Sequence, residues 1–516
     1  MTGQIVVNKR SAKAQHVCAC WGGRKKDAKR RETTEFQLAT GGAGHLTYWT
    51  LNPMEGTMIA EECSLGNQVR TFCSLAYSHD GDYIFAGSTS GDFSAVHVKH
   101  KTMHSTIPAT SNGVLTLIAL RGESGDRLVV GGGDGSISIF DGARDGAGNL
   151  RAMTRGSVGI SVVQVEGRVT ALQLSSPLTD APTEVRLLAG TDRGNFYLVS
   201  LFVSGYAQPD DAAKFVLLQE AHHAAVTAVA YPPDPTGTDP NASSIFATCS
   251  EDGSVRVWDV TDYRVTAKGT CQTQQTGVPS CIAFSGEVVF TGWQDGKIRA
   301  HEAETGGLLW VIDNCHGGGV TSLALSHNLK FLVSGGEEGE VRVWEIRTRE
   351  MFVSLKQHTA AVTAIQIFAD DAQVLSASRD RTIYLWDLHS QARTQALYQR
   401  MGGINGIALL PDQTQVLSVG QEKRASFWDV RQSSPVSALD LGVEHLCIAA
   451  DAAGERFAMG GVDGKVRLWR FKDAVQLCVM DGHSGPVRSV QFSPDKKQLL
   501  STGEDGAILV WNVFPE

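Results

Sequence analysis

The most regular feature of the sequence is a 14-residue pattern that recurs through its second half. Each copy has an apolar segment that ends in small residues, then a polar turn, then a segment in which apolar and polar positions alternate. Alternation with a period of two is typical of β-strands, and short turns between such segments favour antiparallel hairpins. The clearest copies are FATCSEDGSVRVWD, LVSGGEEGEVRVWE, VLSASRDRTIYLWD, FAMGGVDGKVRLWR and LLSTGEDGAILVWN. The pattern therefore predicts repeated hairpins rather than helices.

The copies recur with a nearly constant period. In the second half, the last strand of each copy ends at one of seven positions, Trp258, His301, Trp344, Trp386, Trp428, Trp469 and Trp511. The steps between them are 43, 43, 42, 42, 41 and 42 residues, which is the period of WD repeats. Weaker copies upstream end at Trp49, Val96, Phe140 and Val199. Eleven repeats are visible, and each is expected to form one four-stranded blade of a β-propeller.

The repeat count predicts an all-β chain with two WD40 propellers in tandem. Residues 214–516 hold seven repeats, which we expect to form a complete seven-bladed propeller. The last repeat stops without an outer strand, and the apolar run KFVLLQ at residues 214–219 is expected to close the ring as a latch. Residues 206–213 are small and polar and include a proline, and we interpret them as a linker.

Residues 1–205 hold about four repeats, and they predict a partial N-terminal propeller. Residues 3–7 (GQIVV) are typical of the outer strand of a preceding blade. A seven-bladed ring would need three further blades, or roughly 126 residues at the period of the repeat. Closure of four blades on themselves is the alternative.

Bulk composition excludes several classes of protein. The 516 residues carry a net charge of −9, and the isoelectric point near 5.9 argues against a nucleic-acid partner. No stretch approaches 18 consecutive apolar residues, so we expect no membrane partner. The ten cysteines lack the spacing of a disulfide framework or a metal site, which favours a reducing compartment such as the cytoplasm.

Three repeats carry a histidine before the first strand, an aspartate in the turn and the terminal tryptophan. They are His222, Asp252 and Trp258; His358, Asp380 and Trp386; and His483, Asp505 and Trp511. With the nearby Ser250, Ser378 and Thr502, each set resembles a Ser–His–Asp triad. A catalytic site is needed only once, whereas these sets recur in register. We therefore predict buried hydrogen-bond networks that stabilise the blades.

Other chemistry-bearing patterns are weaker. His97, His100 and His104 lie close together, but they have no companion thiol or carboxylate and straddle a strand end, so we expect no metal site. The Gly-Lys turns lack the rest of a phosphate-binding loop, and no dinucleotide or hydrolase motif occurs. The sequence predicts no catalytic residue, no cofactor and no small-molecule substrate, and hence a protein that is not an enzyme.

A basic run interrupts this acidic chain near its N-terminus. It consists of Arg24, Lys25, Lys26, Lys29, Arg30 and Arg31. We expect it to form the loop between the first two strands of a blade, where it is a candidate contact for an acidic partner such as a microtubule. A solvated loop with no partner is the other interpretation.

Two segments of the second half resemble one family in particular. Residues 293–316 (WQDGKIRAHEAETGGLLWVIDNCH) and 335–346 (GGEEGEVRVWEI) are similar to the ciliary WD-repeat family of cilia- and flagella-associated protein fifty-two. The resemblance is most specific over residues 215–350 and weak before 200. His301 departs from the aromatic residue that the family tends to have there, and the N-terminus is short by about three repeats on the spacing argument. A paralogue or an N-terminally incomplete member is therefore also consistent with the match.

The resemblance implies a tandem propeller in the axoneme of motile cilia or flagella, part of the cytoskeleton. There it would bind tubulin and neighbouring axonemal proteins on the lumenal side of the doublet microtubules. The alternative rests on the fold alone. It is a cytosolic WD40 adaptor of a multiprotein complex, such as a substrate receptor of a ubiquitin ligase or a transport scaffold.

Overall fold

A computed structural model gives the fold of the chain. It describes residues 15–27, 31–66, 69–121, 125–145, 150–155, 162–175, 184–202, 214–233, 244–270 and 277–514. Every regular element in these ranges is a β-strand. No helix in the same ranges is long and apolar enough to cross a membrane. Contacts divide the chain into two compact units, Met1–Glu220 (unit 1) and Ala221–Glu516 (unit 2).

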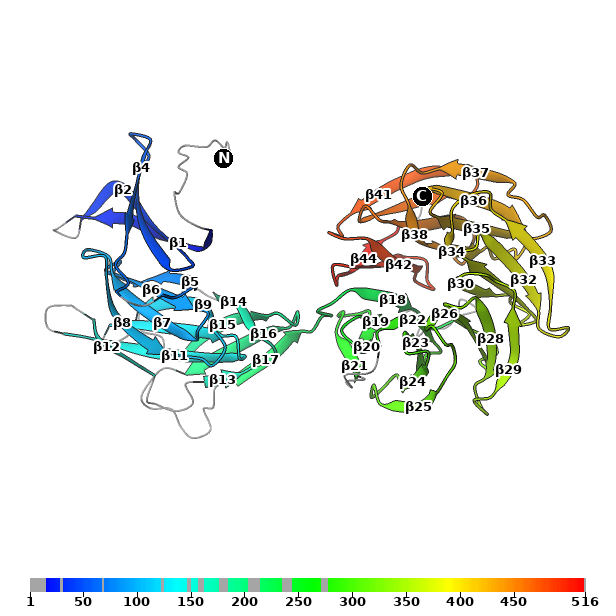
Figure 1. The fold of residues 1–516 in the computed structure, drawn as a ribbon, viewed down its shortest axis with the longest axis horizontal. Helices are drawn as coiled ribbons and strands as arrows, with labels where there is room; N and C mark the ends of the chain where they lie inside the picture. The colour runs from blue at the N-terminus through cyan, green and yellow to red at the C-terminus, as the bar shows by residue number, and fades with distance from the viewer. Residues whose placement is uncertain are drawn as a thin grey trace. The chain divides into compact units, whose positions relative to one another are not determined.

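Unit 1 contains four antiparallel sheets in the residues that the structure describes (Figure 1). The first sheet comprises β1 (His16–Lys26), β2 (Glu32–Gly42), β3 (His45–Asn52) and β4 (Thr57–Glu62). The second comprises β5 (Phe72–Tyr77), β6 (Tyr83–Ser88), β7 (Asp92–His97) and β8 (Thr102–Pro108). The third comprises β9 (Val114–Arg121), β10 (Asp126–Gly132), β11 (Ser136–Arg144), β12 (Leu150–Arg155) and β13 (Val162–Gln164). The fourth comprises β14 (Val169–Leu174), β15 (Glu184–Thr191), β16 (Phe196–Phe202) and β17 (Lys214–Gln219).

The sheets of unit 1 stack in sequence order. Their first strands make contact in the order β1, β5, β9 and β14. No contact of comparable extent joins β14 back to β1 within the described ranges. The four-bladed closure considered above is therefore not what the structure shows. Residues 3–7, expected to form an outer strand, lie outside the described residues.

Unit 2 contains seven sheets, numbered here as blades in chain order (Figure 1). Blade 1 comprises β18 (Val226–Ala230), β19 (Ile245–Ser250), β20 (Ser254–Asp259) and β21 (Val265–Thr270). Blade 2 comprises β22 (Pro279–Phe284), β23 (Val288–Trp293), β24 (Ile298–Glu302) and β25 (Leu308–Ile312). Blade 3 comprises β26 (Val320–Leu325), β27 (Phe331–Gly336), β28 (Glu340–Glu345) and β29 (Met351–Lys356). Blade 4 comprises β30 (Val362–Ile367), β31 (Gln373–Ser378), β32 (Thr382–Asp387) and β33 (Ala392–Tyr398).

The remaining three blades follow the same order. Blade 5 comprises β34 (Ile404–Leu409), β35 (Gln415–Gly420), β36 (Arg424–Asp429) and the short β37 (Ser437–Asp440). Blade 6 comprises β38 (His445–Ala450), β39 (Arg456–Gly461), β40 (Lys465–Arg470) and β41 (Val475–Asp481). Blade 7 comprises β42 (Val487–Phe492), β43 (Gln498–Gly503) and β44 (Ile508–Asn512).

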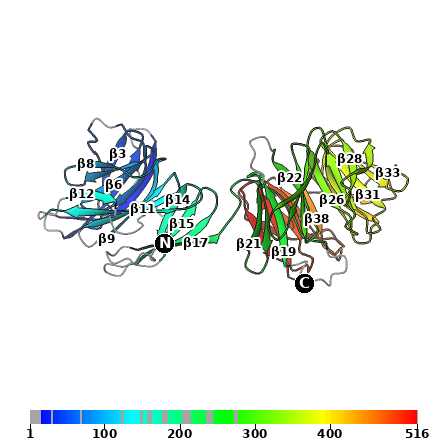
Figure 2. The ribbon, with the colours of Figure 1, turned by 90° about the horizontal axis from the view of Figure 1, so that it is seen from below.

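The seven blades form a closed ring. The first strand of each blade contacts that of the next, and β18 of blade 1 also contacts β42 and β43 of blade 7. Figure 1 shows these first strands around a common centre, and Figure 2 shows the strands of this unit crossing the thickness of the ring. The middle strands are buried on both faces, because each sheet lies between two neighbours. The all-β tandem propeller fold predicted from the repeats, with a complete second ring and a partial first one, is confirmed.

The turn between the second and third strands of a blade lies against the next blade. Gly339 in this turn has a φ of 84°. A Cβ atom at this glycine would lie 2.5 Å from the carbonyl oxygen of His358, which precedes β30. The left-handed conformation and the close approach both favour glycine here, although Arg381 (φ 73°) and Lys423 (φ 61°) adopt the conformation at the equivalent positions of blades 4 and 5. This Glu-Gly turn is thus in close contact with the backbone that leads into the next blade.

The latch prediction is wrong. β17 (Lys214–Gln219) pairs with β16, with Leu198 opposite Val216 and Tyr197 opposite Leu217, and so completes the last sheet of unit 1. The apolar pattern of residues 214–219 identified a strand correctly, but pattern alone does not determine which of two open edges a strand joins. The contacts place the boundary after Glu220 rather than at 214, and the proposed linker at 206–213 lies outside the described residues.

Candidate functional site

The network of blade 4 shows how the recurring histidine, aspartate and tryptophan interact. The Trp386 indole N–H donates to Ser376 Oγ at 2.8 Å. Ser376 Oγ lies 2.8 Å from His358 Nε2, and His358 Nδ1 lies 2.9 Å from Asp380 Oδ2. The serine hydroxyl therefore donates to Nε2, and the Nδ1–H of a neutral imidazole donates to the carboxylate. The backbone N–H of Thr359 adds a further donor to Asp380 at 2.9 Å.

Blades 1 and 7 contain the same arrangement. His222 Nδ1 lies 3.0 Å from Asp252, and His483 Nδ1 lies 3.1 Å from Asp505. Each His Nε2 lies 2.8 Å from a hydroxyl that also accepts the indole N–H of Trp258 or Trp511. The structure thus brings together each of the three predicted sets.

The hydroxyls that made each set resemble a triad, those of Ser250, Ser378 and Thr502, are not the ones that bridge histidine and tryptophan. The bridging residues are Thr248, Ser376 and Ser501, each ten positions before the tryptophan. The Ser250 and Ser378 hydroxyls instead donate to backbone carbonyl oxygens of the loop before the first strand. Ser250, Ser378 and Thr502 come at or near the ends of their strands, while the bridging residue lies within its strand and faces the indole. Thr502 adjoins Ser501 and so points to the opposite face, whereas Ser250 and Ser378 share the face of Thr248 and Ser376 but lie at the last position of their strands, beyond the indole.

Blade 3 has a fourth network that the sequence analysis missed. His316 Nε2 lies 2.8 Å from Ser334 Oγ, which accepts the Trp344 indole N–H at 2.8 Å. His316 Nδ1 lies 2.9 Å from Glu338 Oε1, so a glutamate replaces the aspartate. The signal was present, because His316 precedes Trp344 by 28 residues, as His358 precedes Trp386 and His483 precedes Trp511.

Burial and hydrogen bonding hold these networks in one protonation state. Burial lowers the pKa of His222, and the bond to Asp252 only partly opposes this effect. Burial alone would raise the pKa of Asp380, but hydrogen bonds from His358 and Thr382 outweigh it and lower the pKa to about 2. These shifts favour a neutral imidazole at His222 and an ionised carboxylate at Asp380 at neutral pH.

The geometry of the four networks also decides whether they could act as catalytic triads. Hydroxyl, imidazole and carboxylate lie at the distances of a hydrolase triad, but Thr248, Ser334, Ser376 and Ser501 are all fully buried. Each hydroxyl is enclosed between the indole and the imidazole. A nucleophile must reach the reacting carbon of its substrate, and these oxygen atoms face only protein.

The other three blades vary the network. In blade 5, Trp428 donates to Ser418 at 2.8 Å, and Arg400 stands 28 residues before the tryptophan in place of histidine. In blade 6, Met459 replaces the hydroxyl, and the Trp469 indole nitrogen has no hydrogen-bond partner among the described residues. In blade 2, Trp293 rather than the residue at 301 donates to the Thr291 hydroxyl.

The basic run near the N-terminus was expected to form a loop, but half of it lies in a β-strand. Arg24, Lys25 and Lys26 belong to β1, and Arg31 immediately precedes β2. Lysine and arginine are compatible with an exposed outer position of a hairpin, so the strand simply continues through them. Lys29 and Arg30 lie outside the described residues.

Acidic neighbours neutralise part of this charge. Lys25 Nζ lies 2.9 Å from Glu35 Oε2, and Arg24 lies 3.5 Å from Glu32. Lys26 Nζ donates to the carbonyl oxygen of Asp80 at 3.0 Å, which leaves its charge uncompensated. In the described part of the hairpin, no carboxylate forms an ion pair with the side chain of Lys26 or Arg31. These two cations are therefore the ones available to a partner.

We expected no metal site at His97, His100 and His104. The structure places these residues in a small aromatic cluster with Tyr83. The His97 and His100 rings lie 4.7 Å apart, and both His97 and His104 contact the Tyr83 ring. His97 Nδ1 accepts the backbone N–H of Lys99 at 3.1 Å. No group of three metal-ligating side chains with suitable geometry occurs in the described ranges.

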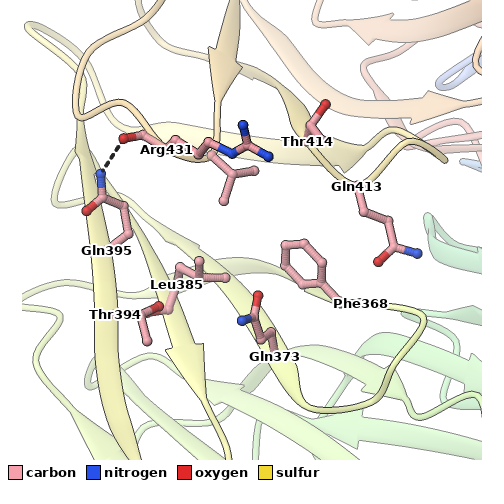
Figure 3. A pocket seen from close by; sticks show the side chains of 9 residues that line it. Phe368, Gln373, Leu385, Thr394, Gln395, Gln413, Thr414 and Arg431 are labelled. Carbon is pink, nitrogen blue, oxygen red and sulfur yellow. Dashed lines mark hydrogen bonds between the residues drawn. The ribbon is translucent and has the colours of Figure 1, made fainter.

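Two grooves on the rim of unit 2 were not foreseen. The first lies between blades 4 and 5 and has a volume of about 400 Å³. Phe368, Leu385 and Val430 form its apolar floor, and Figure 3 shows Leu385 and Arg431 converging on it. The Gln395 side chain donates to the Arg431 carbonyl oxygen at 3.2 Å across this groove.

The second groove lies between blades 5 and 6 and has a volume of about 540 Å³. Phe427, Phe471 and the exposed Val436 line it. Both grooves follow from the short outer strand of blade 5. The segment before β37 contains Pro435 and leaves the blade, and the Ser433 carbonyl accepts the N–H of Tyr398 on blade 4 instead. Such grooves suit side chains of a protein partner.

Family comparisons agree with this architecture. The family model described as WD domain, G-beta repeat, matches residues 214–259 and 474–512. A second family model, described as Vps8 beta-propeller, matches residues 265–394. The chain is a WD-repeat β-propeller protein. Each WD-domain match begins at the outer strand of one sheet and ends at the third strand of the next, so a sequence repeat spans two blades.

Relatives match the WD-repeat chain along most of its length. Cilia- and flagella-associated protein 52 of Homo sapiens is 28% identical over 485 residues, covering 92% of this chain and 71% of the human protein. The proteins of the same name from Bos taurus and Chlamydomonas reinhardtii are 27% and 28% identical, each covering 72% of its own length and 93% and 92% of this chain. The resemblance drawn from residues 293–316 and 335–346 is confirmed.

Proposed function

We propose that this chain is a non-enzymatic scaffold protein of the motile cilium or flagellum, bound to doublet microtubules together with neighbouring axonemal proteins. The observation that carries the proposal is the similarity to cilia- and flagella-associated protein 52 over more than nine-tenths of the chain, in both mammals and an alga. The proposed location is accordingly the axonemal cytoskeleton.

The geometry supports a binding role rather than a chemical one. The hydroxyl groups that resemble nucleophiles are enclosed. The open features are instead the rim grooves, which are lined by apolar and uncharged polar side chains together with a few charged ones. Interfaces between proteins combine such an apolar floor with a polar rim.

The hairpin of β1 and β2 is the proposed contact with tubulin, whose surface is acidic. Lys26 and Arg31 carry charge that no described carboxylate neutralises, on a chain whose net charge is −9. Attraction between this hairpin and an acidic surface is screened beyond a Debye length of about 8 Å at physiological salt. Binding through the hairpin should therefore weaken as salt rises.

Fractionation of cilia tests the location. A tagged copy is expressed in ciliated cells, the cilia are demembranated with detergent, and the axonemes are washed with increasing salt. We expect the protein to remain on axonemes after the detergent step. Recovery of the whole pool in the detergent-soluble fraction would contradict the axonemal proposal.

Charge variants test the tubulin contact separately. The hairpin variant carries both Lys26→Ser and Arg31→Ser. The control variant carries Lys330→Ser and Lys496→Ser, which remove the same charge from exposed positions of unit 2. The hairpin variant should show partial loss of axoneme retention and a weaker dependence on salt, because buried anchors rather than rim charges dominate large interfaces. Equal retention of both variants at every salt concentration would show that the hairpin is only a solvated projection.

A further inference from the structure

One loop of unit 2 presents a serine directly before a proline. Residues 430–436 join β36 to the short β37, and we call them the blade 5 loop. Within it, Ser434 is exposed and Pro435 follows. Proline has no backbone N–H and holds the residue before it in an extended conformation. Proline-directed protein kinases phosphorylate this dipeptide, and they bind it as an extended segment.

The structure distinguishes Ser434 from the other serines that precede proline in this sequence. A second Ser-Pro dipeptide begins at Ser493, which is only 3% exposed. The Ser493 hydroxyl donates to Asp495 at 2.6 Å and accepts the backbone N–H of Gln498 at 2.9 Å. The third dipeptide begins at Ser176, outside the described residues. The dipeptide alone does not choose among the three, whereas burial favours Ser434 over Ser493.

Two backbone hydrogen bonds flank Ser434 in the blade 5 loop. The Ser433 carbonyl oxygen accepts the N–H of Tyr398 on blade 4 at 2.9 Å. On the other side, the Val436 N–H donates to the Phe427 carbonyl oxygen at 2.8 Å. Surface segments held by local hydrogen bonds of this kind open at a small free-energy cost. The blade 5 loop can therefore enter the cleft of a kinase without unfolding of the ring.

Arg431 supplies a cation for a phosphate on Ser434. Its side chain extends over the groove between blades 4 and 5 (Figure 3), and among the described residues that line this groove it is the one that carries charge. No described carboxylate forms an ion pair with it. Arg431 precedes Ser434 by three residues, so their Cα atoms lie at most about 11 Å apart. An arginine and a phosphoserine side chain together can span this distance.

We propose that Ser434 is phosphorylated by a proline-directed protein kinase and that the phosphate binds the Arg431 guanidinium. In this reaction the serine oxygen attacks the γ-phosphorus of ATP, and the bond from that phosphorus to the oxygen of the β-phosphate breaks. ADP leaves, and the hydroxyl proton passes to a base of the kinase. A phosphoserine carries a charge of about −1.5 to −2 at pH 7, so the modification makes this rim of the groove acidic instead of basic.

The inference goes beyond the proposed scaffold function, because it assigns a means of changing the charge beside a groove. It does not depend on whether the protein is found in cilia. Its tests use the purified full chain and a copy isolated from cells. Their failure is therefore distinguishable from failure of the axonemal fractionation.

Phosphorylation of the purified full chain tests the site. The chain is incubated with a proline-directed kinase of the mitogen-activated class, ATP and Mg²⁺, and mass spectrometry locates the phosphate. The controls are two peptides that present the dipeptides without the fold, residues 429–440 (DVRQSSPVSALD) and 488–499 (RSVQFSPDKKQL). Relative to these peptides, Ser434 in the chain should react at least about tenfold faster than Ser493, which reacts only after local opening.

Three outcomes of this test would overturn the proposal. The first is an absence of phosphate on Ser434 in the folded chain. The second is a reaction at Ser493 as fast as that at Ser434, once each is divided by the rate of its peptide. The third is an unmodified Ser434 in a tagged copy isolated from cells treated with a phosphatase inhibitor.

The contact with Arg431 has a separate readout. Phosphorus NMR of the phosphorylated chain measures the second pKa of the phosphate, which is about 6 in a phosphoserine. A neighbouring guanidinium favours the dianion, so this pKa should be a few tenths of a unit lower than in Arg431→Gln. The matched control is Arg347→Gln, which removes an exposed arginine from blade 3 and should leave the pKa unchanged. Equal pKa values with and without Arg431 would contradict the contact.

Discussion

Removing the carboxylate of Asp380 is the sharpest test of the blade networks. Asp380 accepts hydrogen bonds from His358 Nδ1 at 2.9 Å, from the Thr382 hydroxyl at 2.5 Å and from the backbone N–H groups of Thr359 and Thr382 at 2.9 and 3.0 Å. Its side chain is 6% exposed, and that of His358 is fully buried. Asp380→Ala therefore removes the charged acceptor of a buried imidazole N–H and leaves it only the Thr382 hydroxyl, 3.0 Å from His358 Nδ1.

The structure gives the size of the effect by two routes. Losing a buried hydrogen bond to a charged group costs about 1.5–3 kcal/mol. The pKa of Asp380 falls from 3.8 to about 2 on folding, and at about 1.4 kcal/mol for each pKa unit this corresponds to about 2 kcal/mol. Both routes predict that Asp380→Ala lowers the free energy of unfolding by about 2 kcal/mol at neutral pH. Because the folded pKa is the lower one, this contribution is present above pH 4 and is lost as the pH falls toward 2.

The assay is urea unfolding of the full chain at pH 7 followed by tryptophan fluorescence. The matched control is Asp387→Ala, since Asp387 lies in the same blade and its oxygens accept hydrogen bonds from His389 and Ser390 at the surface. The control should change the unfolding midpoint little. If the two variants unfold alike, or if Asp380→Ala abolishes partner binding at unchanged stability, the structural interpretation of the network is refuted.

Three further changes have defined outcomes. Burial, with Arg467 nearby, lowers the pKa of His445 to about 4, so the free energy of unfolding should fall as the pH drops from 6.5 to 4. In unfolding experiments, His445→Gln should flatten this decline, whereas His389→Gln at the surface should not. Arg144→Ala should destabilise unit 1 by roughly 3–5 kcal/mol, because it leaves the buried Asp126 and the neighbouring Asp80 without their cation, whereas the exposed Arg151→Ala should have little effect on the thermal midpoint. Trp386→Phe should lower the free energy of unfolding by about 1 kcal/mol beyond the loss of packing, because the Ser376 hydroxyl loses its indole donor. Urea unfolding of this variant is compared with that of the double variant Trp386→Phe and Ser376→Ala.

Much of the fold was predictable because the period of the repeat can be read directly from the sequence. Seven positions from Trp258 to Trp511 fixed the number of blades in unit 2 before any strand was placed. The recurrence of histidine, aspartate and tryptophan likewise predicted which side chains meet. Such local patterns are reliable because the same backbone geometry recurs in each blade.

The errors concern choices that local pattern does not determine. The apolar run of β17 fits the edge of β16 and that of β44 equally well, and only the whole structure shows that it joins β16. The sequence analysis did not identify the bridging hydroxyls of Thr248, Ser376 and Ser501, because small hydroxyl residues occur at several neighbouring positions of these strands. The blade 3 network was missed because Glu338 replaces aspartate, and the rim grooves depend on Pro435 diverting a loop.

The uneven distribution of the networks has a consequence for motion. Blades 1, 3, 4 and 7 have a full set of partners, whereas the adjacent blades 5 and 6 lack the histidine or the hydroxyl. Local opening of a ring begins where the fewest buried contacts must break. Amide hydrogen exchange should therefore be fastest along the arc from β34 to β41. That arc borders both rim grooves, so the part of the ring that adapts most readily to a partner is also the part with room to receive one.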